Sequence, residues 1–173
     1  MAFTTINFFL FLFVVLLAYY LTPVRYRWLT LLLAGYFFYL NTKPVFALLL
    51  AGVTTSTYFF TLLIEKAKSE TVKNRYKIGN IILILLPLFF FKYFGAVNDG
   101  MIVIAEQLHL RWPLPVMKLM LPVGISFYTF MAIGYTIDVF NEEVEAEKNP
   151  GIVALFISFF PLILSGPIER AKN

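Results

Sequence analysis

Long uncharged runs alternate with short charged segments along this chain, and the alternation predicts a series of membrane-spanning helices. The first charged side chain is that of Arg25, so residues 3–21 form an uncharged run rich in Phe, Leu and Val. At about 1.5 Å of rise per residue, roughly 20 such residues cross the ~30 Å hydrocarbon core of a bilayer. A cleaved signal peptide needs a basic start and a small-residue cleavage site. Because residues 1–3 carry no charged side chain and Ala-Tyr-Tyr at 18–20 is a poor cleavage site, we expect a retained helix.

Further apolar runs predict an all-α, polytopic membrane protein with about five or six transmembrane helices. The expected spans are residues 3–21, 24–41, 45–64, 78–94, 119–138 and 151–168. Two hydrophilic loops are expected: residues 65–77, with five Lys or Arg and two Glu, and residues 141–150, with four Glu. Pro87 predicts a kink in the fourth span.

The segment 95–118 has a different pattern. Asn-Asp-Gly at 98–100 predicts a turn, and a short apolar run follows at 101–110. Pro113 and Pro115 then interrupt any helix. Because ten residues are too few to cross the bilayer, we expect an interfacial or re-entrant helix here.

Composition narrows the class of protein. The chain is 60% hydrophobic and 14% charged, with a mean hydropathy of +0.81, whereas soluble domains have about 25% charged residues. This excludes a soluble enzyme, a disordered segment and a coiled coil. The absence of cysteine excludes a disulfide scaffold, a zinc ribbon and thiol catalysis within these residues. A net charge of +4 is interpreted as the cytoplasmic Lys and Arg excess of a membrane protein, and no nucleic-acid partner is expected.

The same charge bias predicts orientation. Arg25 and Arg27 lie two spans away from the basic loop 65–77, so both segments fall on one side of the membrane. The positive-inside rule places that side in the cytoplasm and the N-terminus outside. The second half of the chain agrees less well with the positive-inside rule, because this orientation places Lys92, Arg111 and Lys118 outside.

Few residues carry recognisable chemistry. A P-loop and a dinucleotide fingerprint are both missing, and a single histidine, His109, excludes a His pair for a metal. His109 is close to Trp112 in the sequence, in a segment typical of an interfacial loop. Asp138 is a functional candidate because charge is costly in lipid; the alternatives are that it faces water or caps a neighbouring helix. Lys92 is either functional or snorkels to the interface.

Two motifs in the fifth span and three outside it form a joint pattern. Leu-Pro-Val-Gly-Ile-Ser-Phe-Tyr-Thr-Phe occupies 121–130, and Tyr-Thr-Ile-Asp-Val-Phe occupies 135–140. Phe-Lys-Tyr-Phe at 91–94, the loop 143–149, and Phe-Phe-Pro followed by Ser-Gly-Pro-Ile-Glu-Arg at 165–170 complete it. The pattern resembles the membrane-bound O-acyltransferase (MBOAT) family, closest to its bacterial alginate O-acetylation branch. Met131 and Phe140 depart from it, since the family often has Gln and Tyr there.

This resemblance implies transfer of an acyl group, usually acetyl, to hydroxyls of an exported polysaccharide or cell-envelope polymer. It implies acetyl-CoA or an acyl-carrier thioester as donor, an extracytoplasmic acetyltransferase partner, and a multi-pass protein of the bacterial inner membrane. The family's catalytic histidine lies in a later helix, and His109 does not match its context. The chain therefore resembles the N-terminal part of a longer enzyme, with no catalytic residue of its own and no activity alone.

The resemblance also implies that helix-breaking residues bend the wall of a funnel joining the two membrane faces, although ordinary proline kinks are the alternative. Asp138 and Arg170 are expected to pair electrostatically. No metal site is expected. The candidate funnel-lining or structural residues are Lys92, Pro122, Gly124, Ser126, Asp138, Pro161, Gly166, Pro167 and Arg170.

Two other functions stay open. A transporter or channel half needs ionisable or broken-helix sites near the bilayer midplane, and the clustering of charges at span ends disfavours it. A non-catalytic membrane assembly subunit is the third interpretation.

Overall fold

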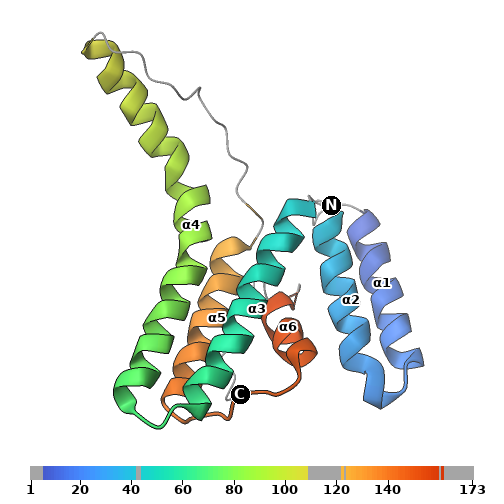
Figure 1. Cartoon of the computed structure of the whole chain (residues 1–173). Helices are drawn as coiled ribbons and strands as arrows, with labels where there is room; N and C mark the ends of the chain where they lie inside the picture. The colour runs from blue at the N-terminus through green and yellow to red at the C-terminus, as the bar shows by residue number, and fades with distance from the viewer. Residues whose placement is uncertain (1–5, 42–43, 109–121, 123, 160, 162–173) are drawn as a thin grey trace.

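The computed structural model of the chain describes residues 6–41, 44–108, 122, 124–159 and 161. Within these residues the regular structure is entirely helical, which confirms the all-α prediction for this part (Figure 1). The elements are α1 (Ile6–Leu21), the short 3-10 turn η1 (Val24–Tyr26), α2 (Arg27–Leu40), α3 (Pro44–Lys66), α4 (Glu70–Gln107), α5 (Ile125–Phe140) and α6 (Pro150–Ser158).

Two stretches of the described chain are long and apolar enough to cross a membrane, α3 and residues 70–105 of α4. Helices α1 and α5 are also apolar but have 16 residues each. A helix of that length rises about 24 Å, which is less than the ~30 Å hydrocarbon core. The predicted membrane character is thus supported, and the number of complete spans stays a prediction.

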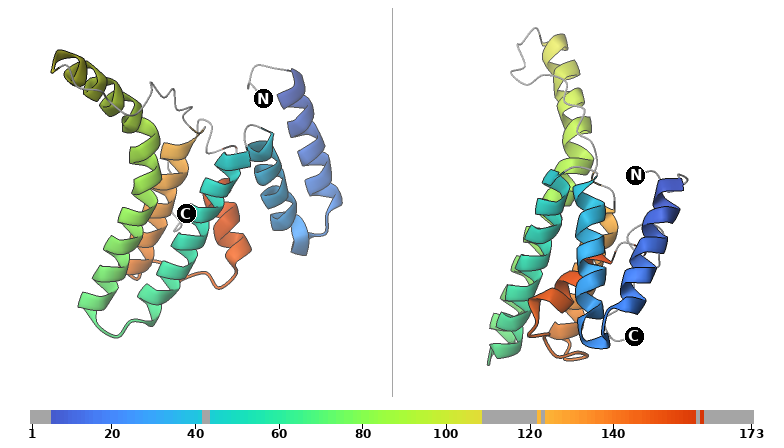
Figure 2. Two further views of the ribbon diagram at one scale, coloured as in Figure 1. Left: turned by 45° about the horizontal axis from the view of Figure 1, so that its top comes forward. Right: turned by 90° about the vertical axis from the view of Figure 1, so that its right-hand side faces the viewer.

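The helices pack in two groups that share α3. Helices α3, α4 and α5 form a three-helix bundle, while α6 packs against α2 and α3, and α1 packs against α2 at the edge (Figures 1 and 2). The core between them is largely apolar, and within the described residues its completely enclosed side chains come from α2, α3, α4, α5 and α6. They include Leu50, Ile64, Ile84, Ile125, Met131 and Ile157.

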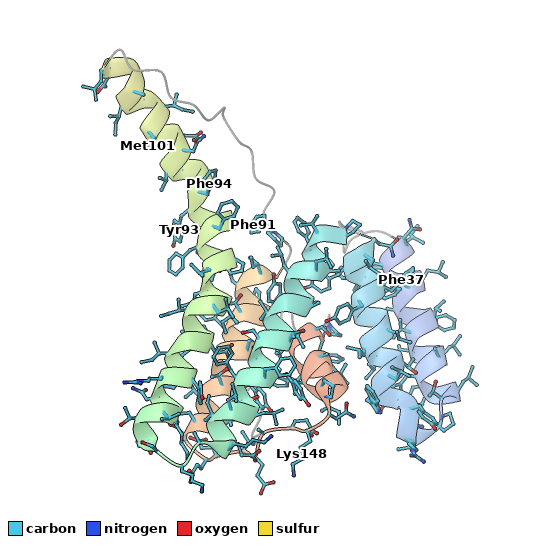
Figure 3. The ribbon with its side chains drawn as sticks, in the orientation of Figure 1. Phe37, Phe91, Tyr93, Phe94, Met101 and Lys148 are labelled. Carbon is cyan, nitrogen blue, oxygen red and sulfur yellow. The ribbon has the colours of Figure 1, made fainter. Side chains whose placement is uncertain are left out.

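The observed bounds of α4 differ from the prediction at two places. The predicted turn at 98–100 is wrong, because α4 continues through Pro87 and Gly100 to Gln107. Most of the predicted loop 65–77 is also wrong, since only residues 67–69 separate α3 from α4. Lys, Arg and Glu are good helix formers, so the charged segment at 70–77 can be helical. An internal glycine costs only about 1 kcal/mol, so Gly100 does not end the helix. The part of α4 that carries Phe94 and Met101 leans away from the other helices (Figure 3).

Helix α6 is shorter than the predicted span 151–168. It has nine residues and ends at Ser158, where Phe159 takes an extended conformation. Pro161 follows closely, and residues just before a proline avoid the helical conformation. At about 1.5 Å per residue, α6 rises roughly 13 Å, less than half of a bilayer core. Residues 162–168 lie outside the described part.

The hydrophilic loop after α5 is confirmed. Helix α5 closes in a Schellman motif: the Glu143 N–H donates to the Asp138 carbonyl at 2.9 Å, and Glu142 has a left-handed φ of 59°. The chain then crosses the end of the bundle to Asn149, whose Oδ1 accepts the Gly151 N–H and caps α6. The end of the bundle that carries this loop and residues 65–77 is here called the basic end.

Candidate functional site

The residues predicted at the start of α5 fix the direction of that helix. Gly124 has a φ of 73°, a conformation that L side chains rarely adopt. The Ile125 N–H donates to the Pro122 carbonyl, and the Tyr128 N–H donates to the Gly124 carbonyl. Pro122 is buried and Gly124 is half-buried. The structure therefore places a rigid bend here, while a funnel wall at this position stays a prediction.

The remaining candidates do not gather at one place. Lys92 is exposed on α4, with its Nζ 5.6 Å from the centroid of the Tyr93 ring. Ser126 is half-buried in the first turn of α5, whereas Asp138 stands twelve positions later, about 18 Å along the helix axis. Pro161 is exposed. Gly166, Pro167 and Arg170 lie outside the described residues, and so does the predicted pairing of Asp138 with Arg170.

Asp138 is the most informative of these candidates. Its residue is only 2% exposed, and its Oδ2 has no hydrogen-bond partner in the described part of the chain. The alternative that it faces water is therefore wrong. A buried polar atom without a hydrogen-bond partner is costly, and ionisable residues in membrane helices usually serve a function.

Three buried hydroxyls share this property. Tyr128 Oη and Thr129 Oγ1 on α5, and Ser158 Oγ at the end of α6, are enclosed and lack a hydrogen-bond partner among the described residues. The Tyr128 ring lies 6.5 Å from that of Tyr39 on α2. The interior where α2, α5 and α6 meet, here called the polar junction, therefore contains hydroxyl groups that make no hydrogen bond within the described part of the chain.

Gly35 sets how closely α6 approaches the polar junction. A Cβ added at Gly35 would lie 2.9 Å from the Ser158 carbonyl oxygen. Real Cβ atoms are rarely so close to a backbone oxygen, so only glycine lets α2 and the end of α6 touch. Sequence reasoning missed Gly35 and Ser158, because neither belongs to a hydropathy pattern that names its partner.

A second polar group is fully bonded. Asn80 on α4 is enclosed; its Oδ1 accepts from Ser56 Oγ on α3 at 2.7 Å, and its Nδ2 donates to Thr136 Oγ1 on α5 at 2.8 Å. This hydrogen-bond chain joins three helices. Sequence reasoning also missed Asn80, although an amide flanked by apolar residues at 78–86 was a usable signal.

The same face of α4 makes an ion pair and a cation–π contact with residues at and just beyond the end of α5. Lys73 pairs with Glu142, and Lys77 Nζ lies 3.5 Å from the centroid of the Phe140 ring. The hydrogen bond and charge of Lys73 lower the pKa of the Glu142 carboxyl, and Glu142 in turn raises the pKa of Lys73. Residues 73, 77 and 80 of α4 thus form a continuous line of contacts with α5, here called the α4–α5 seam.

The loop 141–149 is fixed over the basic end. Glu65 Oε1 accepts from the Ala146 N–H at 3.3 Å, and the Tyr135 hydroxyl accepts from the Glu147 N–H at 2.9 Å. Tyr58 donates its hydroxyl hydrogen to the Lys148 carbonyl at 2.9 Å. The labelled Lys148 and Met101 lie at opposite ends of the molecule (Figure 3). Across the described residues, no three His, Asp or Glu side chains form a metal site.

Comparison with known proteins relates the chain to polymer O-acetylases. It is 39% identical over 170 residues to the probable alginate O-acetylase AlgI of Pseudomonas aeruginosa, a match covering 96% of this chain and 32% of the relative. Its counterpart in Azotobacter vinelandii is 37% identical over 170 residues, covering 96% and 34%. The peptidoglycan O-acetyltransferase of Helicobacter pylori is 30% identical over 168 residues, covering 81% and 30%.

These relatives are longer proteins, and the chain spans about a third of their length. No family model matches the chain, and no solved structure matches it. Over nearly its whole length the chain is thus related to proteins named for the O-acetylation of alginate, and over most of it to one named for that of peptidoglycan.

Proposed function

We propose that this chain is part of a membrane-bound O-acyltransferase of the MBOAT family, which transfers an acetyl group to hydroxyls of an exported polysaccharide or cell-envelope polymer. The observation that carries the proposal is the 39% identity over 170 residues to a protein named as an alginate O-acetylase. The apolar helices support a multi-pass protein of the bacterial inner membrane, with the basic end in the cytoplasm and the N-terminus outside.

The described residues contribute architecture to this reaction. Helix α6 starts at the basic end and stops inside the helix assembly beside Gly35. In lipid, the last carbonyls of a helix that ends at depth need protein or water around them. The half-length α6 and the bend at Pro122 and Gly124 therefore suit the wall of a chamber. The donor, acetyl-CoA or a carrier thioester, would approach from the basic end, and the acceptor with its extracytoplasmic transferase partner from the other side.

The function of the whole protein is testable by genetics and polymer analysis. Deleting the gene that encodes this chain should lower the ester-linked acetyl content of the exported or envelope polymers, measured by NMR before and after mild alkali. Reintroducing the gene should restore it. Unchanged acetylation in the deletion strain would contradict the proposal. The purified 173-residue chain should show no acetyl transfer to polymer, and turnover by it would show that a catalytic group has been overlooked.

Asp138 gives a specific reason to keep a second candidate, a half of a transporter. The Oδ2 atom of Asp138 is buried without a hydrogen-bond partner in the described chain, and ionisable residues within membrane helices mark ion and substrate pathways. In that case a deletion strain would retain acetylated polymer but lose export or uptake of a solute.

A further inference from the structure

The second half of α4 extends beyond the packed helices. The helix has 38 residues, which rise about 57 Å at 1.5 Å per residue. A straight span across a ~30 Å hydrocarbon core therefore leaves a large part of α4 outside it. The extension is the part that carries the labelled Tyr93, Phe94 and Met101 and leans away from the other helices (Figure 3).

One side of this extension is apolar at regular spacing. Phe90, Val97 and Ile104 recur every seven residues, and Phe94, Met101 and Leu108 recur at the same interval between them. At 100° per residue these six positions fall within about 80° of one another. All except the half-buried Phe94 are exposed, with Val97 61% and Leu108 62% accessible. This set is here called the distal stripe.

The other sides of the extension differ in character. Lys92 and Asp99, also seven residues apart, are exposed on the side opposite the distal stripe. Asn98 and Ala105 are buried on a third side. The extension is therefore amphipathic, with one side suited to an apolar medium and another suited to water. Neither free projection into water nor complete immersion in hydrocarbon satisfies both sides.

The distal stripe continues the surface of the first half of α4. Leu83, Leu86 and Phe90 are exposed on the same side of the helix, in the part that packs within the bundle. Where α4 crosses the membrane, these side chains face lipid. The stripe thus extends the exposed apolar side of the first half of α4 along the same side of the helix. Pro87, which lacks an N–H, lies between the two halves, where a helix bends most readily.

We propose that residues 93–108 lie along the membrane surface opposite the basic end, with the distal stripe at the boundary between headgroups and acyl chains and Lys92 and Asp99 in water. Tyr93, at the start of this segment and exposed, suits the headgroup level. The partner of this surface is the lipid bilayer. The proposal rests on the membrane insertion proposed above and does not depend on acyl transfer.

Site-directed spin labelling tests this placement, and the cysteine-free chain needs no background substitution. The 173-residue chain is reconstituted in phosphatidylglycerol–phosphatidylethanolamine vesicles with a nitroxide at I104C, V103C, D99C or L86C. Collision with oxygen, which partitions into lipid, is compared with collision with a water-soluble nickel chelate. Val103 is the matched control for Ile104, because both are exposed β-branched residues but Val103 lies on the Lys92 and Asp99 side.

The expected result is that oxygen dominates at I104C and L86C, and nickel dominates at V103C and D99C. Nickel dominance at I104C would overturn the proposal in favour of an extension projecting into water. Exclusion of both reagents from I104C would overturn it in favour of a covering protein, a second copy if dilution with lipid restores access. Oxygen dominance at V103C would also overturn it, because the segment would then be fully immersed. Nickel dominance at L86C would instead refute membrane insertion itself.

Discussion

The α4–α5 seam and the polar junction are both polar regions inside an apolar protein, but they differ in how many of their polar atoms are hydrogen-bonded. In the seam, both ends of the Asn80 amide are hydrogen-bonded and Lys73 is paired with Glu142. At the polar junction Tyr128, Thr129 and Ser158 keep buried hydroxyl oxygens, and at the opposite end of α5 Asp138 keeps a buried carboxyl oxygen, without a hydrogen-bond partner in the described chain. Satisfied polar groups hold helices in register, whereas unsatisfied ones mark places where a further group is expected to bind or react.

The largest expected effect separates activity from stability at Asp138. D138N removes the buried carboxyl group but keeps the shape of the side chain, so the free energy of unfolding in detergent should stay unchanged or rise. Polymer acetylation by the whole protein should fall about tenfold or more, equivalent to about 1.4 kcal/mol of transition-state stabilisation. D99N, at an exposed site of α4, is the control and should change neither quantity. Full activity together with lost stability would assign Asp138 to the scaffold.

The next effect concerns the contact of α2 with α6. G35A places a Cβ against the Ser158 backbone and should lower the free energy of unfolding by about 1–3 kcal/mol, because the two helices must move apart. G52A is the matched control, since nothing lies within 4 Å of a Cβ there. It should be neutral or stabilising by up to about 1 kcal/mol through helix propensity. Equal effects of the two variants in thermal unfolding would contradict the close approach at Gly35.

Within the seam, removing the bridging amide should be costly. N80A leaves Ser56 Oγ and Thr136 Oγ1 without their partner and should destabilise the protein by about 1–3 kcal/mol. T136S keeps a hydroxyl at the same place and should cost less. A double-mutant cycle of S56A with N80A should show coupling, and strict additivity would mean that the chain of bonds does not act as a unit.

The smallest effect is that of the Lys73–Glu142 pair, which is partly exposed, with side-chain accessibilities of 17% and 75%. The lowered pKa of Glu142 means that its contribution is present above the unfolded pKa and is lost as pH falls through the folded value. The raised pKa of Lys73 means that its contribution is lost only at high pH. The difference in stability between E142Q and the parent should thus be present at pH 7, vanish near pH 2, and shrink with salt. A difference independent of both pH and salt would contradict an ionic origin.

The helix bounds also show which parts of the fold can be predicted from the sequence. The apolar runs predicted α1, α2 and α3 well, because helix length follows directly from uncharged length. The turn at 98–100 failed because its local preference is weaker than the continuation of an established helix. Helix α6 ends at Ser158, where Phe159 is extended, and the rest of the predicted span 151–168 lies largely outside the described residues.

The site was less predictable than the fold. Asp138 was singled out because a charge at the end of an apolar run is conspicuous, and Gly124 because it belongs to the motif at 121–130 on which the family resemblance rests. Gly35, Asn80 and Ser158 were missed because their roles depend on partners in other helices, brought together only by folding. A hydropathy pattern shows which side of a helix is polar but not which distant group it meets.

The buried end of α6 creates a local negative potential inside the protein. The aligned peptide dipoles of a helix place roughly half a negative charge at its C-terminus, which here is Ser158, enclosed beside Gly35. A medium of low polarity screens this field weakly. A phosphate group brought near Ser158 would therefore be repelled, whereas an uncharged ester or thioester group would not.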